Sequence, residues 1–202
     1  MPRRGESDRQ RWDRKHSEKR YDPGIRPTPL LQRVVDEHHL GPGTRALDLA
    51  CGRGRNALFL AERGLTVTAV DVSEVALEHC RRAAQDRGVE IETVRTDLTK
   101  WDLGENRWGL IVDTYFLDRR LLHRAPRALR PGGLFVLEHF TVEHPAVSSY
   151  GPTTPDYLLE LGEARTALKA LEVLVYDEGV FDLGEGTHSG RAGLVRCVGR
   201  RS

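Results

Sequence analysis

Apolar and polar positions follow two rhythms along this chain. Short β-branched or apolar runs predict buried strands, whereas Leu, Val and Ala repeated at helical spacing predict amphipathic helices. The predicted strands are 45–49, 66–70, 91–96, 110–114 and 134–140, and the predicted helices are 29–39, 56–63, 73–87 and 120–129. Strands that alternate with helices of about 10–15 residues indicate a parallel sheet made of βαβ units.

The last quarter of the chain departs from this alternation. A helix is predicted over 157–168, and it is followed by strands at 171–175 and 194–198 with a polar, glycine-rich loop between them. Two strands without an intervening helix indicate an antiparallel hairpin at the sheet edge. The predicted fold class is therefore α/β, a Rossmann-like seven-stranded, mostly parallel sheet with helices on both faces and a C-terminal antiparallel hairpin.

The first 20 residues have a different composition from the rest. They hold eight Lys or Arg and four Asp or Glu, and Trp12 is their only large apolar side chain. Pro and Gly residues between 23 and 29 then interrupt any helix. We expect a basic, mobile or lightly docked N-terminal arm over 1–25 and a single domain over 26–202.

Overall composition narrows the function further. The 31 Lys and Arg nearly balance the 30 Asp and Glu, for a formal charge of +1, which argues against a protein that coats nucleic acid or an anionic membrane. No apolar run approaches the roughly 20 residues of a spanning helix, and the N-terminus lacks the apolar core of a secretory signal. Three cysteines without a CxxC pair indicate a reducing, cytoplasmic location, and no His or Cys spacing predicts a metal site.

A glycine-rich turn lies between the first strand of the sheet and the next helix. Residues 46–57 read Ala-Leu-Asp-Leu-Ala-Cys-Gly-Arg-Gly-Arg-Asn-Ala, which places Gly52 and Gly54 in the turn. Glycines let the backbone approach a ligand closely, and the following helix offers unpaired N–H groups. The pattern Gly52-x-Gly54-x-x-Ala57 also satisfies the dinucleotide-binding motif, so the turn alone leaves NAD open as a ligand.

Carboxylates at three predicted strand ends separate the two ligands. Asp48 precedes the turn, where it would repel a pyrophosphate and attract a free ammonium group such as the amino-acid end of S-adenosylmethionine. Asp71 ends the second strand and can accept from ribose hydroxyls of either ligand. Asp97 follows the third strand, where a carboxylate can accept from the adenine amine. Only Asp48 discriminates, and it favours S-adenosylmethionine.

Four motifs carry a resemblance to a known family. They are LDLACGRG at 47–54, VDVS at 70–73, TDL at 96–98 and ALRPGGLFVLE at 128–138. In this combination, residues 26–202 resemble the class I S-adenosylmethionine-dependent methyltransferases. Within that superfamily, Gly54-Arg55-Asn56 and EGTHSGRAGLV at 185–195 resemble the tellurite-resistance-type, thiol-methylating branch.

This resemblance implies S-adenosyl-L-methionine as cofactor, with S-adenosyl-L-homocysteine as product, and a small-molecule acceptor, with a thiol or a selenium or tellurium oxyanion favoured. Relatives fold aromatic residues over the cofactor at positions like Trp12 and Tyr21, and Thr114 with Tyr115 would edge the methyl-transfer cleft. The implied cofactor-binding residues are Trp12, Tyr21, Asp48, Gly52, Gly54, Asn56, Asp71, Val72, Asp97, Leu98 and Thr114.

Candidate catalytic residues lie late in the chain. Methyl transfer from a sulfonium is an in-line displacement in which the protein mainly aligns the reactants, so a dedicated base is needed only for a protonated acceptor. His139 ends the fifth strand, where ligands bind in open α/β sheets. His188 and Arg191 lie before the last strand, and by the same resemblance they could bind an oxyanion or the acceptor.

Two alternative functions remain open from the sequence. One is an NAD(P)-dependent oxidoreductase on a similar fold, and the other is a protein that binds S-adenosylmethionine without turnover. Asp48 argues against the first, as does the absence of sequence for a separate substrate domain. We expect a small-molecule methyl acceptor as the partner, and neither nucleic acid nor a membrane.

Overall fold

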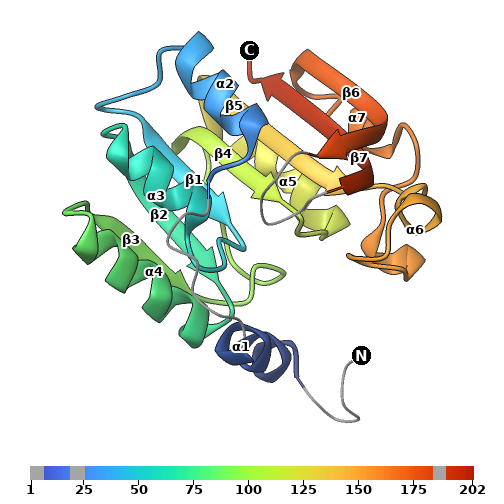
Figure 1. Cartoon of the computed structure of the whole chain (residues 1–202). Coiled ribbons are helices and arrows are strands. Elements are labelled where there is room, and N and C mark those ends of the chain that lie inside the picture. The colour runs from blue at the N-terminus through green and yellow to red at the C-terminus, as the bar shows by residue number, and fades with distance from the viewer. Residues whose placement is uncertain (1–6, 19–25, 184–189) are drawn as a thin grey trace. The chain divides into compact units, whose positions relative to one another are not determined.

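The computed structural model describes residues 7–18, 26–183 and 190–202. The chain forms two compact units, Met1–Asp102 and Leu103–Ser202. Its seven strands follow the order β3-β2-β1-β4-β5-β7-β6, which confirms the predicted Rossmann-like fold class (Figure 1). The predicted boundary between an arm and a domain at residue 25 falls at the end of 19–25, outside the described residues, and stays a prediction.

The first unit is built on three parallel strands. They are β1 (Arg45–Leu49), β2 (Thr66–Asp71) and β3 (Ile91–Arg95), and the helices are α1 (Asp8–Glu18), α2 (Pro29–Glu37), α3 (Arg55–Glu62) and α4 (Glu74–Asp86). β2 pairs with β1 on one side and with β3 on the other. Helices α3 and α4 pack on these strands. The carboxyl ends of β1 and β2 therefore lie side by side, with Leu49 opposite Val70.

The amphipathic pattern explains why α4 forms where the sequence predicts it. Its Ala76, Leu77 and Cys80 side chains are completely buried, on the stripe that helical spacing puts on one face. The Ser73 hydroxyl accepts from the Ala76 N–H at 3.2 Å and caps the helix. Gly88, with φ +66°, follows the C-terminal end.

The second unit adds the C-terminal hairpin. Its strands are β4 (Trp108–Thr114), β5 (Leu129–Phe140), β6 (Glu172–Leu183) and β7 (Gly190–Arg200), and its helices are α5 (Arg119–Ala128), α6 (His144–Val147), the 3₁₀ turn η1 (Pro155–Tyr157) and α7 (Glu163–Ala167). β4 and β5 are parallel, whereas β7 runs antiparallel to both β5 and β6. The predicted hairpin is confirmed, and both of its strands are longer than the sequence indicated.

The predicted helix over 157–168 is wrong in its first half. Leu158 and Leu159 are buried, and Leu159 pairs with the chain just beyond β5. The Leu159 N–H donates to the Phe140 carbonyl at 3.0 Å, and the Val142 N–H donates to the Leu159 carbonyl at 3.0 Å. These bonds hold the segment extended, so only Glu163–Ala167 is helical.

Within the predicted arm, the structure shows a helix that the sequence pattern does not predict. Helix α1 has no buried residue, so it offers no apolar stripe to find. Its Asp13 Oδ1 accepts from the Ser73 hydroxyl at 2.7 Å and from the Val75 N–H at 3.4 Å. A tertiary contact with the start of α4 therefore positions α1, and the described part of the arm is docked.

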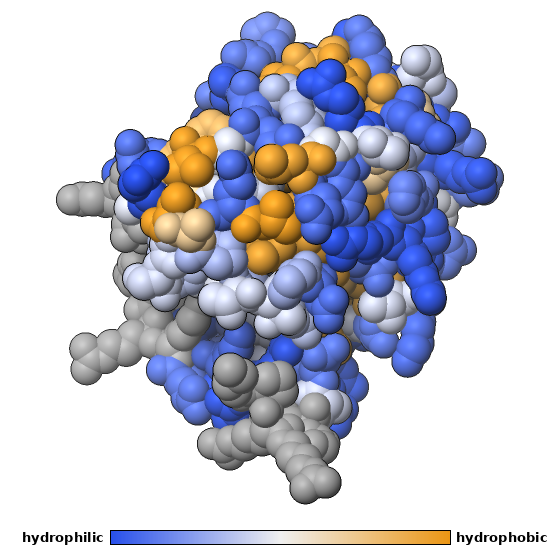
Figure 2. All heavy atoms as spheres, turned by 90° about the vertical axis from the view of Figure 1, so that its right-hand side faces the viewer, coloured by the Kyte–Doolittle hydropathy of each residue, from blue (hydrophilic) through white to orange (hydrophobic). Residues whose placement is uncertain are grey.

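Apolar side chains also reach the surface of the second unit. Figure 2 shows several separate apolar clusters among hydrophilic side chains on the face it presents. The exposed large hydrophobic residues recorded in the structure are Tyr157, Leu161, Val173 and Val180. No helix among the described residues is long and apolar enough to cross a membrane.

Candidate functional site

The turn after β1 adopts the conformation that its glycines permit. Gly52 and Gly54 have φ values of +56° and +85°, in the left-handed region. The Gly54 carbonyl accepts from the Leu58 N–H at 2.7 Å and starts α3. A Cβ at Gly54 would lie 2.3 Å from the Cys80 Sγ. Gly54 is thus required by its backbone angle and by the close approach of α4.

Asp48 lies beneath this turn with its side chain 1% exposed. Its Oδ2 accepts from the Ala57 N–H at 3.1 Å, whereas its buried Oδ1 has no hydrogen-bond partner among the described residues. Burial raises the pKa of this carboxyl to about 7, against the opposing effects of the Arg55 charge and the Ala57 N–H. A cationic donor beside Oδ1 would satisfy that oxygen and favour the ionised form. The site therefore fits an ammonium group.

Asp71 ties the end of β2 to the glycine turn. Its Oδ2 accepts from the Gly52 N–H and its Oδ1 from the Ser73 N–H, both at 2.8 Å. Burial raises its pKa, while these N–H donors act in the opposite direction. These two bonds fix the orientation of the Asp71 carboxylate. Because each carboxylate oxygen has two lone pairs, both oxygens can still accept a hydrogen bond from a ribose hydroxyl.

The other predicted cofactor residues of the first unit have varied surroundings. Asn56 is buried, and its Oδ1 accepts from the Thr28 N–H at 3.2 Å, a tie between α3 and the start of α2. Asp97 accepts from the Thr99 hydroxyl at 2.7 Å, and this bond is the main cause of its lowered pKa. Val72 is half-buried and Leu98 is buried. The cofactor-binding roles of these residues stay predictions.

The described part of the arm lies against the same turn. The Arg53 guanidinium donates to the His16 carbonyl in α1, and the His16 ring lies 3.6 Å from where a Cβ of Gly52 would be. The Trp12 ring has the Lys15 ammonium 4.5 Å from its centroid, so a neighbouring cation occupies one of its faces. The predicted partner Tyr21 falls outside the described residues.

In the second unit, the structure brings together residues that sequence reasoning missed. Glu138 in β5 is 2% exposed and accepts from the Tyr115 hydroxyl on Oε1. Its Oε2 accepts from the Arg196 Nε at 2.9 Å. Thr114, a predicted site residue, is half-buried at the end of β4 and lies opposite Glu138. An acidic residue inside the apolar run 134–140 was the one signal in the sequence for this cluster.

The three predicted catalytic residues have different surroundings, and the structure describes two of them. His139 is 2% exposed, its Nδ1 lies 3.1 Å from the Phe140 carbonyl oxygen, and burial lowers its pKa to about 4, so its ring is neutral at pH 7. Arg191 is exposed near the start of β7, opposite Asp182. His188 falls outside the described residues. Their roles stay predictions.

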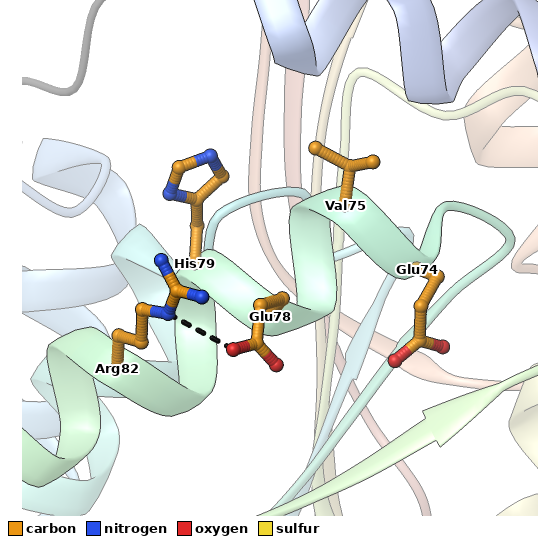
Figure 3. A pocket seen from close by; sticks show the side chains of 5 residues that line it. All are labelled: Glu74, Val75, Glu78, His79 and Arg82. Atoms are coloured by element: carbon orange, nitrogen blue, oxygen red, sulfur yellow. Dashed lines mark hydrogen bonds and ion pairs between the residues drawn. The ribbon is translucent and has the colours of Figure 1, made fainter.

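A surface depression of about 350 Å³ lies on α4. Figure 3 shows its lining side chains projecting from that single helix, with the Arg82 Nε paired to a Glu78 oxygen at 2.9 Å. The lining residues are Glu74, Val75, Glu78, His79 and Arg82. None of the predicted cofactor residues lines it, so we do not assign it to the site. Among the described residues, no group of three or more His, Cys, Asp or Glu could hold a metal ion.

Comparison with known sequences finds similarity over the central part of the chain. A family model described as a methyltransferase domain matches residues 46–133, from β1 to the start of β5. The chain is 35% identical over 121 residues to the cypemycin N-terminal methyltransferase of a Streptomyces species, covering 56% of this chain and 49% of that protein. It is 34% identical over 120 residues to the demethylmenaquinone methyltransferase of Clavibacter sepedonicus, covering 55% and 48%. The chain thus spans about half the length of these relatives.

Comparison with solved structures supports the fold. TehB from Haemophilus influenzae superposes with a TM-score of 0.69 at 22% identity, covering 85% of this chain and 62% of that one. A protein solved in connection with the conversion of a disulfide bond into a thioacetal group during echinomycin biosynthesis superposes with a TM-score of 0.72 at 20% identity, covering 97% and 92%. Residues 46–133 are thus similar to a methyltransferase domain, and the likeness to the solved structures shows the fold.

Proposed function

We propose that this protein transfers a methyl group from S-adenosylmethionine to a small-molecule acceptor, with a thiol or a selenium or tellurium oxyanion favoured. The observation that carries the proposal is the buried Oδ1 of Asp48, which lacks a hydrogen-bond partner among the described residues. A diphosphate would place like charge beside this carboxylate, whereas the ammonium of an amino acid supplies the missing donor. Asp48 therefore favours S-adenosylmethionine over a nicotinamide dinucleotide.

The remaining residues of the first unit have complementary roles in this proposal. Asp71, already oriented by two backbone N–H groups, accepts from the ribose hydroxyls. The side chains of Val72 and Leu98 offer apolar surface to the adenine, and Asp97 accepts from its amine. When bound, the cofactor supplies a methyl group on a positively charged sulfur, which is a strong leaving group. The protein's task is to bind, orient and exclude water.

The proposed acceptor class rests on a sequence resemblance and on one exposed arginine. The segment 185–195 resembles the thiol-methylating branch, and Arg191 within it is exposed, with a guanidinium suited to an oxyanion. The relatives' names specify other acceptors, among them the N-terminus of cypemycin and demethylmenaquinone. Acceptors therefore differ between these relatives, and an assay over several acceptors tests the proposed class.

Calorimetry with S-adenosylhomocysteine tests the cofactor assignment. Removing the charge of Asp48 as Asp48→Asn should weaken binding by at least about 30-fold, the equivalent of the lower end of the cost of truncating a buried charge pair. Asp86→Asn, which changes an exposed carboxylate at the end of α4, should bind as the wild type does. Absence of binding to the wild type, with NAD binding instead, contradicts the proposal.

The pH dependence of the same affinity provides an independent readout. Asp48 has a pKa of about 7 in the free protein, and the ammonium group favours its ionised form. Affinity should therefore fall as pH decreases below 7, by roughly tenfold per unit, and level off above it. In Asp48→Asn this dependence should be absent. A wild-type affinity that is constant from pH 5 to pH 8 would count against the role of Asp48.

An acceptor panel tests the rest. Aliphatic thiols, arenethiols, selenite and tellurite are incubated with S-adenosylmethionine, and release of S-adenosylhomocysteine is measured. Turnover restricted to other acceptors would refute the thiol or oxyanion assignment. Binding of S-adenosylhomocysteine without turnover on any acceptor would instead identify a non-catalytic binding protein.

A further inference from the structure

Glu138 is the centre of a hydrogen-bonded triad in the second unit. The Tyr115 hydroxyl donates to its Oε1, and the Arg196 Nε donates to its Oε2 at 2.9 Å. The three residues come from neighbouring strands: Tyr115 directly follows β4, Glu138 lies in β5, and Arg196 lies opposite Glu138 in β7. The carboxylate itself is 2% exposed, whereas the Tyr115 side chain is half-buried. A ligand at the end of β4 would therefore meet the phenol and not the carboxylate.

The backbone holds Tyr115 in an unusual conformation. Its φ is +63°, a left-handed value that costs a residue with a large side chain free energy and is found preferentially at functional sites. The Tyr115 N–H donates to the Glu138 carbonyl at 2.9 Å and fixes that backbone. Its ring packs against Phe140, with centroids 4.8 Å apart. The phenol is thus constrained by its main chain, its ring and its hydroxyl.

Arg196 is constrained in the same way. Its side chain is 21% exposed, and its guanidinium carbon lies 4.5 Å from the centroid of the Phe181 ring. With this stacking and the bond to Glu138, the arginine compensates the buried negative charge. Glu138 therefore has a donor on each oxygen, of which one is a fixed cation and the other carries a proton that can move.

The nearby histidines are poorly suited to accept a proton. The Nδ1 of His139 and the Nε2 of His144 lie 3.1 Å and 2.7 Å from main-chain carbonyl oxygens. Both residues are almost completely buried, and burial lowers the pKa of each. Tyr115 is half-buried and is coupled directly to a carboxylate. At the carboxyl ends of β4 and β5, it is the better placed proton acceptor.

We propose that Tyr115 and Glu138 take up the proton that a protic methyl acceptor, a thiol or a hydroxyl, releases when it is methylated. This inference rests on the proposed function. As the bond between the acceptor atom and the methyl carbon forms, the carbon–sulfur bond of the donor breaks and its electron pair stays on sulfur. The acceptor proton passes to the Tyr115 oxygen, and the Tyr115 proton passes to Glu138 Oε1.

Glu138 is then a neutral acid, and its proton subsequently passes to water. Tyr115 is the catalytic residue in this relay, Glu138 accepts through it, and Arg196 is a positioning residue. The relay selects acceptors that carry a proton at neutral pH over oxyanions that have already lost it. It therefore favours a thiol or hydroxyl as the acceptor of the proposed methyl transfer.

The experiment compares full-length wild type with Tyr115→Phe, which retains the ring and removes the hydroxyl. Turnover is measured at pH 7 on thiols of graded acidity, from aliphatic thiols to arenethiols that are largely ionised. Tyr115→Phe should lower kcat by about 100-fold on the least acidic thiols, the lower range for loss of a general base, and change it little on the ionised ones. Raising the pH should restore the rate, and S-adenosylhomocysteine affinity should be unchanged.

Matched variants separate the relay from packing. Tyr157→Phe removes the hydroxyl of an exposed tyrosine in the same unit and should leave turnover unchanged. Glu138→Gln, which cannot accept the proton, should reproduce the dependence on thiol acidity. For the positioning role of Arg196, Arg196→Lys should retain more of the wild-type pH profile than Arg196→Met does.

The outcomes distinguish this inference from the function on which it rests. If Tyr115→Phe slows all thiols equally, or none, the relay is wrong while the methyl transfer stands. A wild type that methylates selenite or tellurite but no thiol or hydroxyl also overturns the relay alone. A wild type that binds S-adenosylhomocysteine and methylates nothing overturns both proposals.

Discussion

The carboxylates at the strand ends of the two units are held in opposite ways. In the first unit, Asp48 and Asp71 accept from backbone N–H groups. These donors belong to the turns that follow β1 and β2 and to the first turn of α3. In the second unit, Glu138 accepts from the side chains of Tyr115 and Arg196, which lie 23 and 58 residues away in sequence. Backbone donors accompany a turn wherever it forms, whereas side-chain donors must be brought together by distant strands.

Both units also place a residue other than glycine in the left-handed region directly after a parallel strand. Ala50 follows β1 with φ +50°, and Tyr115 follows β4 with φ +63°. In the first unit the chain continues into a turn whose glycines adopt the same region at little cost. In the second unit the large side chain at that position is retained by its bond to Glu138. The first arrangement shapes a loop, and the second orients a functional group.

Removing Glu138 should give the largest effect. Glu138→Ala leaves the Arg196 charge without its buried partner and should lower the free energy of unfolding by about 3–5 kcal/mol, measured by urea denaturation. Glu172→Ala is the control, because Glu172 pairs with Arg200 at a similar N···O distance of 3.0 Å but both side chains are exposed. This substitution should lower the free energy of unfolding by about 0–1 kcal/mol. Equal losses would show that burial does not distinguish the two pairs.

A methyl group added to the glycine turn should give an intermediate effect. Gly54→Ala forces a Cβ against the Cys80 Sγ at 2.3 Å, whereas Gly43→Ala has the same backbone angle, φ +86° against +85°, with nothing within 4 Å. The difference in unfolding free energy between the two variants isolates crowding from backbone strain and should be about 1–3 kcal/mol. If the variants are equally stable, the turn does not need the close contact with α4.

Local helix caps should give the smallest effect and should be alike in both units. The Ser73 hydroxyl accepts from the Ala76 N–H, and Asp118 Oδ1 accepts from the Leu121 N–H. Ser73→Ala and Asp118→Ala should each lower the unfolding free energy by about 1 kcal/mol. Any larger loss of unfolding free energy in Ser73→Ala than in Asp118→Ala should come from the lost hydrogen bond between Ser73 and Asp13. In a chain without residues 1–18, the two substitutions should therefore have equal effects. An excess that persists in the truncated chain would mean that α1 does not stabilise this cap.

The sequence was most informative where interactions are short in range. The first three strands and the helices between them lie within about a residue of their predicted bounds, since their apolar stripes, caps and glycines are adjacent in sequence. The carboxylate Asp48 was recognised by its place before the turn. Prediction failed for α1, which has no buried residue, and for the segment at Leu158, where pairing with the end of β5 overrides helical spacing.

By itself, the sequence determined the class of fold, the glycine turn and the acidic residues beside it, because these depend on periodicity and on contacts between near neighbours. Only the tertiary structure decided that Asp48 retains a buried oxygen without a donor among the described residues, and that Tyr115, Glu138 and Arg196 meet. Burial and long-range pairing depend on how distant strands align in the sheet. No local pattern of residues encodes that alignment.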